Sequence, residues 1–174
     1  MSSDALCIGL PARVDRDCRV LVLGSMPGVA SLQEQQYYAH PRNRFWPLLG
    51  DLCGFDPALA YEARLRALAD AGVGLWDVIG QCERRGSLDA DIVRGSEVPN
   101  PIAEVLATLP ALQLVACNGA AAHRAFQRFI VPGLQRPLDV PVLALPSTSP
   151  ANAAASLPAL HHAWRAVGES LARL

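Results

Sequence analysis

Two kinds of apolar pattern alternate along the chain. Continuous apolar runs predict buried β-strands at 20–23, 73–79, 112–117 and 140–145. Apolar residues at helical spacing, together with residues typical of helix ends, predict helices at 44–53, 57–71, 101–109, 119–130 and 157–174. The charged segment 83–97 is predicted to be a surface loop. Because strands and helices alternate, we expect an α/β fold with a short central four-stranded parallel sheet flanked by helices.

Four residues follow or end the predicted strands: Gly24, Asp77, Asn118 and Pro146. The carboxyl ends of parallel strands share one edge of the sheet, where open α/β sheets leave a crevice for ligands. The turn after the first strand is bracketed by Gly24 and Gly28, and glycine lets a ligand approach the backbone closely. Such a turn is also ordinary connection chemistry. The sequence therefore predicts a site at this edge.

Composition bounds the class of protein. With 174 residues, 51% hydrophobic content and a net charge of -1, the sequence predicts a single domain, 1–174, with a sizeable core. No apolar run approaches the ~20 residues of a membrane span, and no signal-peptide pattern is found, so we expect a cytoplasmic protein. The five cysteines are odd in number and lack CxxC spacing. This pattern favours reduced thiols over disulfides or a metal site.

All 15 cationic side chains are arginine, so the chain has no lysine. This excludes a lysine Schiff base as the covalent nucleophile, and it excludes a Walker-type phosphate loop. The net charge does not exclude nucleic acid, because an enzyme that contacts a few phosphates needs only a local arginine face.

Two segments resemble motifs of the uracil-DNA glycosylase superfamily, especially its mismatch-specific (G:U/G:T) branch. That branch has a Gly-Ile-Asn-Pro-Gly turn followed by an Ala-His-Pro-x-Asn-x-Phe-Trp run. The counterparts here are Gly-Ser-Met-Pro-Gly at 24–28 and Ala-His-Pro-Arg-Asn-Arg-Phe-Trp at 39–46. The loop 145–152 is similar to the family's second motif, which inserts into DNA, and 75–77 occupies the place of its base-recognising strand end. The resemblance spans nearly the whole chain.

One departure from the family pattern bears on mechanism. The mismatch-specific branch positions water with the Asn of its first motif and the uracil-specific branch uses an Asp, but Met26 stands there in this chain. Leu145 likewise replaces the histidine of the uracil-specific second motif. These losses resemble the hypoxanthine-DNA glycosylase branch, which has a non-polar first motif and assigns catalysis to the Asn of the Pro-x-Asn-x-Phe-Trp run. The resemblance implies that Asn43 has this role.

The resemblance implies a three-layer fold and a monofunctional DNA glycosylase that hydrolyses a deaminated base from DNA, hypoxanthine first and uracil second. It implies no metal, no organic cofactor and no obligate protein partner. Cleavage of the N-glycosidic bond passes through an oxocarbenium-like state, so an amide that aims a water at the sugar is sufficient. We assign catalysis to Asn43, the backbone of Met26, and Ser25. We assign base binding to Gly24, Phe45, Trp76, Asp77 and Asn118. We assign DNA binding to Arg42, Arg44, Ser147, Thr148, Ser149, Pro150, Ala151 and Asn152.

Each assignment has a structural alternative. Asn43 and Asn118 are good helix caps, Phe45 suits a core, and Asp77 can cap the next turn. The segment 147–152 also suits a plain surface loop. For the whole chain, the alternatives are a uracil or mismatch glycosylase of the same fold and a catalytically silent module that binds damaged DNA or a free nucleobase.

Overall fold

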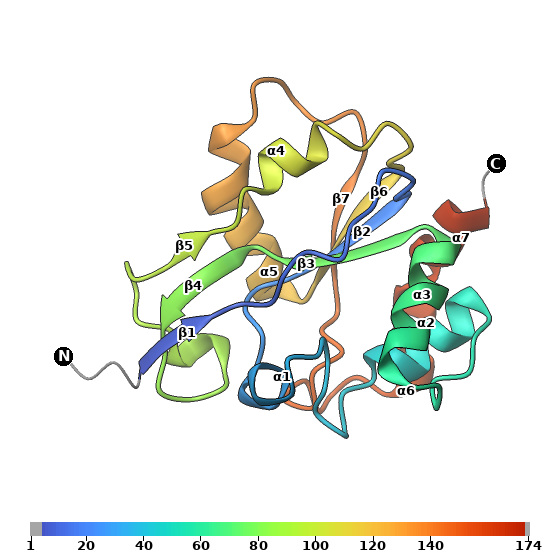
Figure 1. Cartoon of the computed structure of the whole chain (residues 1–174), viewed down its shortest axis with the longest axis horizontal. Helices are drawn as coiled ribbons and strands as arrows, with labels where there is room; N and C mark the ends of the chain where they lie inside the picture. The colour runs from blue at the N-terminus through green and yellow to red at the C-terminus, as the bar shows by residue number, and fades with distance from the viewer. Residues whose placement is uncertain (1–4, 173–174) are drawn as a thin grey trace.

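A four-stranded parallel sheet forms the centre of the computed structural model, which describes residues 5–172 (Figure 1). Its strands are β2 (Val20–Gly24), β3 (Val73–Asp77), β6 (Leu114–Asn118) and β7 (Val142–Leu145). Their order in the sheet is β3-β2-β6-β7, so β2 is paired on both sides. The predicted central parallel sheet is confirmed, and the carboxyl ends of its strands share one edge.

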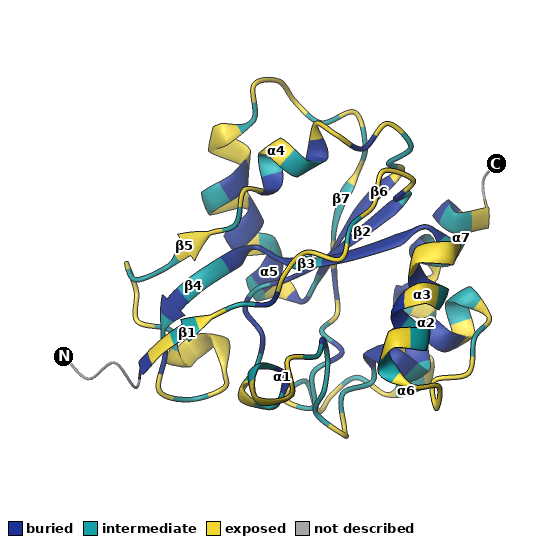
Figure 2. Cartoon of the chain, in the orientation of Figure 1, coloured by how far each residue is buried: buried dark blue, intermediate teal, exposed yellow. Residues whose placement is uncertain are grey.

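Helices cover both faces of this sheet. One face packs against α2 (Phe45–Cys53), α3 (Tyr61–Ala71), α6 (Leu157–Ala163) and α7 (Arg165–Ala172). The other face packs against α4 (Ile102–Leu106), α5 (Ala120–Ala125) and the π-helical turn Phe126–Ile130 that continues α5. Alternate residues of β2 point to the two faces and are fully buried, so this strand reads as a continuous apolar run (Figure 2). The three-layer α/β fold is confirmed.

A second, smaller sheet was not predicted. Its strands are β1 (Leu6–Ile8), β4 (Ile79–Glu83) and β5 (Val98–Pro99), antiparallel in the order β1-β4-β5. The strand predicted within 73–79 ends at Asp77 as expected, but residue 79, which was included in it, is the first residue of β4. Val78 and Ile79 follow Asp77 directly, so the apolar pattern did not separate β4 from β3. The predicted loop 83–97 begins inside β4 and contains a short 3₁₀ turn, Asp89–Asp91.

Several helix boundaries also differ from the prediction. The segment 157–174 forms two helices that divide at Trp164, which is fully buried and donates its indole N–H to the carbonyl of Pro146 over 2.9 Å. Residues 173–174 lie outside the described part of the chain. A short helix α1 (Val29–Glu34) follows the first turn and was not predicted. The predicted helices at 101–109 and 57–71 are shorter than expected, whereas Gly72 ends α3 as expected, with φ +94°.

Among residues 5–172, no helix has the length and apolar character that a membrane span requires.

Candidate active site

A cleft of about 690 Å³ opens at the carboxyl edge of the central sheet. The loops after β2 and β7 lie beside α1 on this side of the molecule (Figure 1). Their residues line the cleft together with the ends of β3 and β6 and part of the loop that follows β4. Predicted site residues on its walls are Gly24, Ser25, Met26, Arg42, Asn43, Asp77, Asn118, Ser147, Thr148, Ser149, Pro150, Ala151 and Asn152. A larger hollow, about 1220 Å³, lies at the amino ends of the strands and contains none of them.

The side chain of Asn43 is held in one orientation. Its Oδ1 accepts hydrogen bonds from the backbone N–H of Phe45, at 2.9 Å, and from the hydroxyl of Thr148, at 2.8 Å. Two donors at one end of the amide place the oxygen there and turn the NH₂ group away from them. Because Asn43 also lines the cleft, its NH₂ group is the part left for a bound molecule. Asn43 therefore accepts the N–H of the first residue of α2 and lines the cleft at the same time.

Thr148 connects Asn43 to the end of β6. Its hydroxyl accepts a hydrogen bond from Nδ2 of Asn118, and its backbone N–H donates to Oδ1 of the same residue, each at 3.0 Å. Its carbonyl accepts from the backbone N–H of Arg44 at 3.1 Å. Thr148 is fully buried, so its hydroxyl belongs to this network and does not lie where a phosphate would contact it.

Side-chain hydrogen bonds from Arg44 and Asn152 hold the loop after β7. Nη2 of Arg44 donates to the carbonyls of Ser149, at 2.8 Å, and Asn152, at 2.9 Å. The side chain of Asn152 donates to the carbonyl of Ser147 at 3.0 Å. Arg44, which we assigned to DNA, is thus directed into its own chain. Arg42 is exposed at the rim of the cleft.

Asp77 ends β3 at the base of the cleft and is 5% exposed. Burial, and secondarily the charge of Asp89, raises the pKa of its carboxyl to about 7, whereas Arg84 opposes the shift. Its Oδ2 finds no hydrogen-bond partner among the described residues. A Cβ atom at Gly24 would overlap Oδ1 of Asp77, so the glycine is required for the carboxyl to lie where it does.

The cleft holds no group of three metal-binding side chains within residues 5–172, and neither does any other part of that range. A model of the Uracil DNA glycosylase superfamily matches residues 11–168. The chain belongs to this superfamily. The predicted family membership is therefore confirmed.

Relatives of this uracil DNA glycosylase superfamily member support the same conclusion. It is 37% identical over 145 residues to a hypoxanthine DNA glycosylase from Methanosarcina acetivorans, covering 83% of this chain and 87% of the relative. It is 40% identical over 112 residues to a hypoxanthine DNA glycosylase from Methanosarcina barkeri, covering 64% and 70%. A solution NMR structure from M. acetivorans, provisionally named a uracil DNA glycosylase, matches with a TM-score of 0.80 at 32% identity and covers 97% of this chain and 99% of that one.

In this superfamily member the turn 24–28, the counterpart of the family's first motif, lines the cleft. The side chain of Met26 is nearly buried and packs against Ile79 and Cys82. The hydroxyl of Ser25 donates to the carboxylate of Asp89. The Met26 side chain is thus part of a small apolar cluster and the Ser25 hydroxyl is engaged by Asp89, while the catalytic roles assigned to Ser25 and to the Met26 backbone stay predictions.

Two residues that we assigned to base binding do not line the cleft. Phe45 is fully buried in the core, and the indole N–H of Trp76 donates to the carbonyl of Leu10 at 3.2 Å. Trp76 precedes Asp77 in β3, so the two side chains point to opposite faces of the sheet. The alternation of side chains along β3 therefore explains why Trp76 does not line the cleft although Asp77 does.

Tyr38 lines the cleft in place of Phe45. Its ring stacks on Phe45, with centroids 3.9 Å apart and an interplanar angle of 22°. Its backbone is left-handed, with φ +54°, which is uncommon for an aromatic residue. Its hydroxyl is buried without a partner among the described residues, and burial raises its pKa. The pair of tyrosines before Ala39 was the available signal, although it did not distinguish Tyr38 from its neighbours.

Proposed function

We propose that this protein hydrolyses the N-glycosidic bond of a deaminated base in DNA, hypoxanthine first and uracil second, and leaves an abasic site. The observation that carries the proposal is the fixed amide of Asn43 at the cleft. Its oxygen is occupied by Phe45 and Thr148, so the NH₂ group is available to a water. The two Methanosarcina relatives named hypoxanthine DNA glycosylase support hypoxanthine as the first substrate.

The reaction needs a water that is aimed, not strongly activated. The water accepts a hydrogen bond from Nδ2 of Asn43 and donates one to a carbonyl of the Met26 turn. As the C1′–N bond breaks, its electrons leave with the base and the sugar becomes cationic. The aimed water then bonds to C1′ and loses a proton. Holding the water in line removes the entropy cost of bringing it to C1′ during the reaction.

The base of the cleft suits recognition of a deaminated base. Ionised Asp77 accepts a hydrogen bond from N1–H of hypoxanthine, and N3–H of uracil presents a similar donor. Tyr38, already stacked on Phe45, offers an aromatic face to a flipped base. Asp77, Tyr38 and Asn118 all line the cleft.

The rim of the cleft suits contact with the DNA strand. Arg42 is exposed and supplies a cation for a phosphate. Pro150 and Ala151 lie in the loop held by Arg44 and form a small wedge that can enter the stack of bases.

The five cysteines are free thiols, which supports a reducing compartment such as the cytoplasm.

The test uses oligonucleotides that each carry one hypoxanthine, uracil, xanthine or thymine mismatch. Incubation with the protein is followed by alkali, which breaks the strand at abasic sites. We expect cleavage at hypoxanthine, slower cleavage at uracil, and intact strands before alkali, because the lysine-free chain lacks the usual amine for β-elimination. Borohydride should trap no covalent complex above a heat-killed control. Inactivity on all four substrates, with DNA affinity retained, would instead favour the silent binding module.

A further inference from the structure

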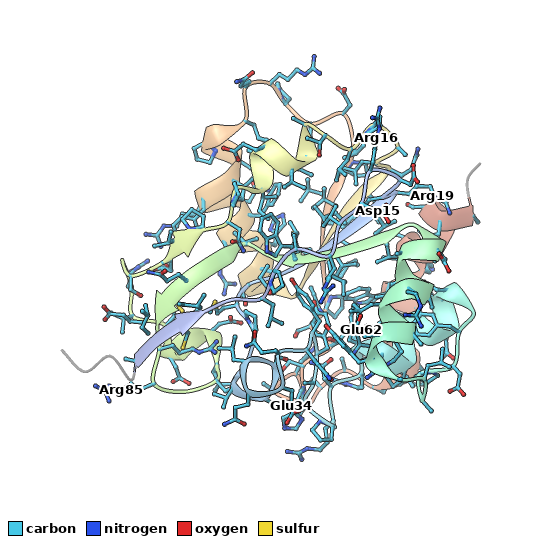
Figure 3. The ribbon with its side chains drawn as sticks, viewed as in Figure 1. Asp15, Arg16, Arg19, Glu34, Glu62 and Arg85 are labelled. Atoms are coloured by element: carbon cyan, nitrogen blue, oxygen red, sulfur yellow. The ribbon has the colours of Figure 1, made fainter. Side chains whose placement is uncertain are left out.

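Arg84 is a buried cation directly behind the first-motif turn. It follows β4 and is 2% exposed, whereas its neighbour Arg85 is exposed and points away from the molecule near β1 (Figure 3). Nη2 of Arg84 donates to the carbonyl of Pro27 over 2.6 Å. Pro27 lines the cleft, so the guanidinium is hydrogen-bonded to a residue of the cleft wall.

Arg84 makes no direct ion pair in the part of the chain that the structure describes. The ion pairs found there join Arg128 to Glu97 and His161 to Asp51. Nε and Nη1 of Arg84 are buried and lack hydrogen-bond partners among residues 5–172. Burying an unpaired charge is costly, so folded proteins normally pair such a group. An arginine kept in this state next to a cleft points to an electrostatic role at that cleft.

The charge of Arg84 has two electrostatic effects on groups that line the cleft. Its charge lowers the pKa of Asp77, against the effect of burial, so it acts on a carboxyl that lines the cleft. The bond to the Pro27 carbonyl also polarises the peptide that joins Pro27 to Gly28, which makes the Gly28 N–H a stronger donor. Charges act more strongly here than in water, because the surroundings are poorly polarisable.

We propose that Arg84 is a positioning residue that holds the Pro27–Gly28 peptide and, through its buried charge, stabilises the departing base. This inference rests on the proposed function. When the C1′–N bond breaks, both bonding electrons stay on the base nitrogen, and the anionic base later takes a proton from solvent. The water oxygen bonds to C1′ and releases its proton to solvent. A cation on the side of the base favours this separation of charge.

The test compares two leaving groups that share one pairing edge. Hypoxanthine and 8-azahypoxanthine differ by one ring nitrogen, which delocalises the negative charge of the departing base. Single-turnover rates are measured for the full chain and for Arg84→Gln, which keeps a donor without the charge, and Arg84→Lys, which keeps the charge. Arg85→Gln is the matched control, because it removes the same charge from the neighbouring exposed position.

We expect the rate of Arg84→Gln on hypoxanthine to fall roughly tenfold or more. On 8-azahypoxanthine the factor by which the rate falls should be about threefold smaller. Arg84→Lys should stay within about threefold of the natural chain on both bases, and Arg85→Gln within about twofold. Equal losses on both bases in a folded Arg84→Gln would overturn the proposal, since a purely structural role predicts them. If Arg84→Gln does not fold, a tenfold loss on both bases in folded Arg84→Lys overturns it. Inactivity of the natural chain on both bases would instead contradict the proposed function, and with it the role of Arg84.

Discussion

The hydroxyl of Thr148 donates a hydrogen bond to Oδ1 of Asn43 over 2.8 Å, although 105 positions separate the two residues. Asn118, at the end of β6, holds Thr148 in turn. Three distant segments thus set the direction of one amide. The NH₂ group of Asn43 is oriented by the folded chain itself, so its orientation costs nothing when DNA binds.

The first prediction concerns this contact. Thr148→Val keeps the shape of the side chain and removes the hydroxyl that donates to Asn43. We expect the single-turnover rate to fall roughly tenfold and the free energy of unfolding to fall by about 1–3 kcal/mol, because Asn118 loses a buried partner. Thr148→Ser restores the hydroxyl and should keep most of the rate. A folded Thr148→Val with full activity would show that the orientation of Asn43 does not depend on this bond.

The second prediction tests Asn43 directly. Asn43→Ala should lose roughly 10²-fold or more in single-turnover rate, as expected when a positioning contact is removed. Because Asn43 also accepts from Phe45 at the start of α2, unfolding should become easier by about 1 kcal/mol. Met26→Ala is the control, since only the backbone of residue 26 is proposed to act. Activity that survives Asn43→Ala but vanishes in folded Asp77→Asn would make Asp77 the water-activating residue.

The third prediction is a pH dependence of the rate. Burial raises the pKa of Asp77 to about 7, and the proposed acceptor for N1–H is the ionised carboxylate. The rate on hypoxanthine should therefore rise as the pH increases through about 7. In Asp77→Asn the amide oxygen can still accept the N1–H, so a lower rate without this step in pH is expected. A step of the same size in both proteins would show that another group titrates.

The fourth prediction follows from the same pKa and concerns stability. The unfolded chain releases the Asp77 proton near pH 4, whereas the folded chain keeps it until about pH 7. The folded state therefore binds more protons between these values, and the free energy of unfolding falls as the pH rises through this window, by up to about 4 kcal/mol. Urea unfolding at several pH values measures the effect. Asp77→Asn should remove this fall, and an unchanged pH profile in the variant would contradict the assignment.

The fifth prediction separates the two arginines beside Asn43. Arg42 is exposed, whereas Arg44 donates to the carbonyls of Ser149 and Asn152. Arg42→Gln should reduce the dependence of log affinity for DNA on log salt by about one unit, because one phosphate contact is lost. Arg44→Gln should weaken binding and leave this slope nearly unchanged, because it loosens the loop. Identical slopes in the two variants would contradict the proposed contact between Arg42 and a phosphate.

Local pattern was sufficient to predict the central sheet and its ligand-binding edge. The apolar runs at β2 and β6 are buried on both faces, and such runs are typical of parallel strands. The second sheet was missed because β1 has three residues and β5 has two. Strands this short carry almost no period, and only Val78 separates the end of β3 at Asp77 from the start of β4.

The sequence predicted which residues meet at the candidate site better than it predicted the contacts that their side chains make. Asn43, Asp77 and Asn118 meet at one cleft as expected, because strand ends and the start of a helix are visible in sequence. The direction in which a long side chain points cannot be seen in the sequence. Arg44 turns toward the loop at 149–152 and Tyr38 covers Phe45, and both outcomes depend on segments that only the fold brings together.

A Cβ atom at position 24 would overlap Oδ1 of Asp77, so these two positions depend on each other in this chain. A chain that carries an acidic residue at the end of β3 can evolve a side chain at position 24 only after the carboxyl is shortened or moved. Glycine at position 24 and aspartate at position 77 should therefore be inherited as a pair. A protein in which one is replaced and the other kept would have rebuilt the base of its cleft.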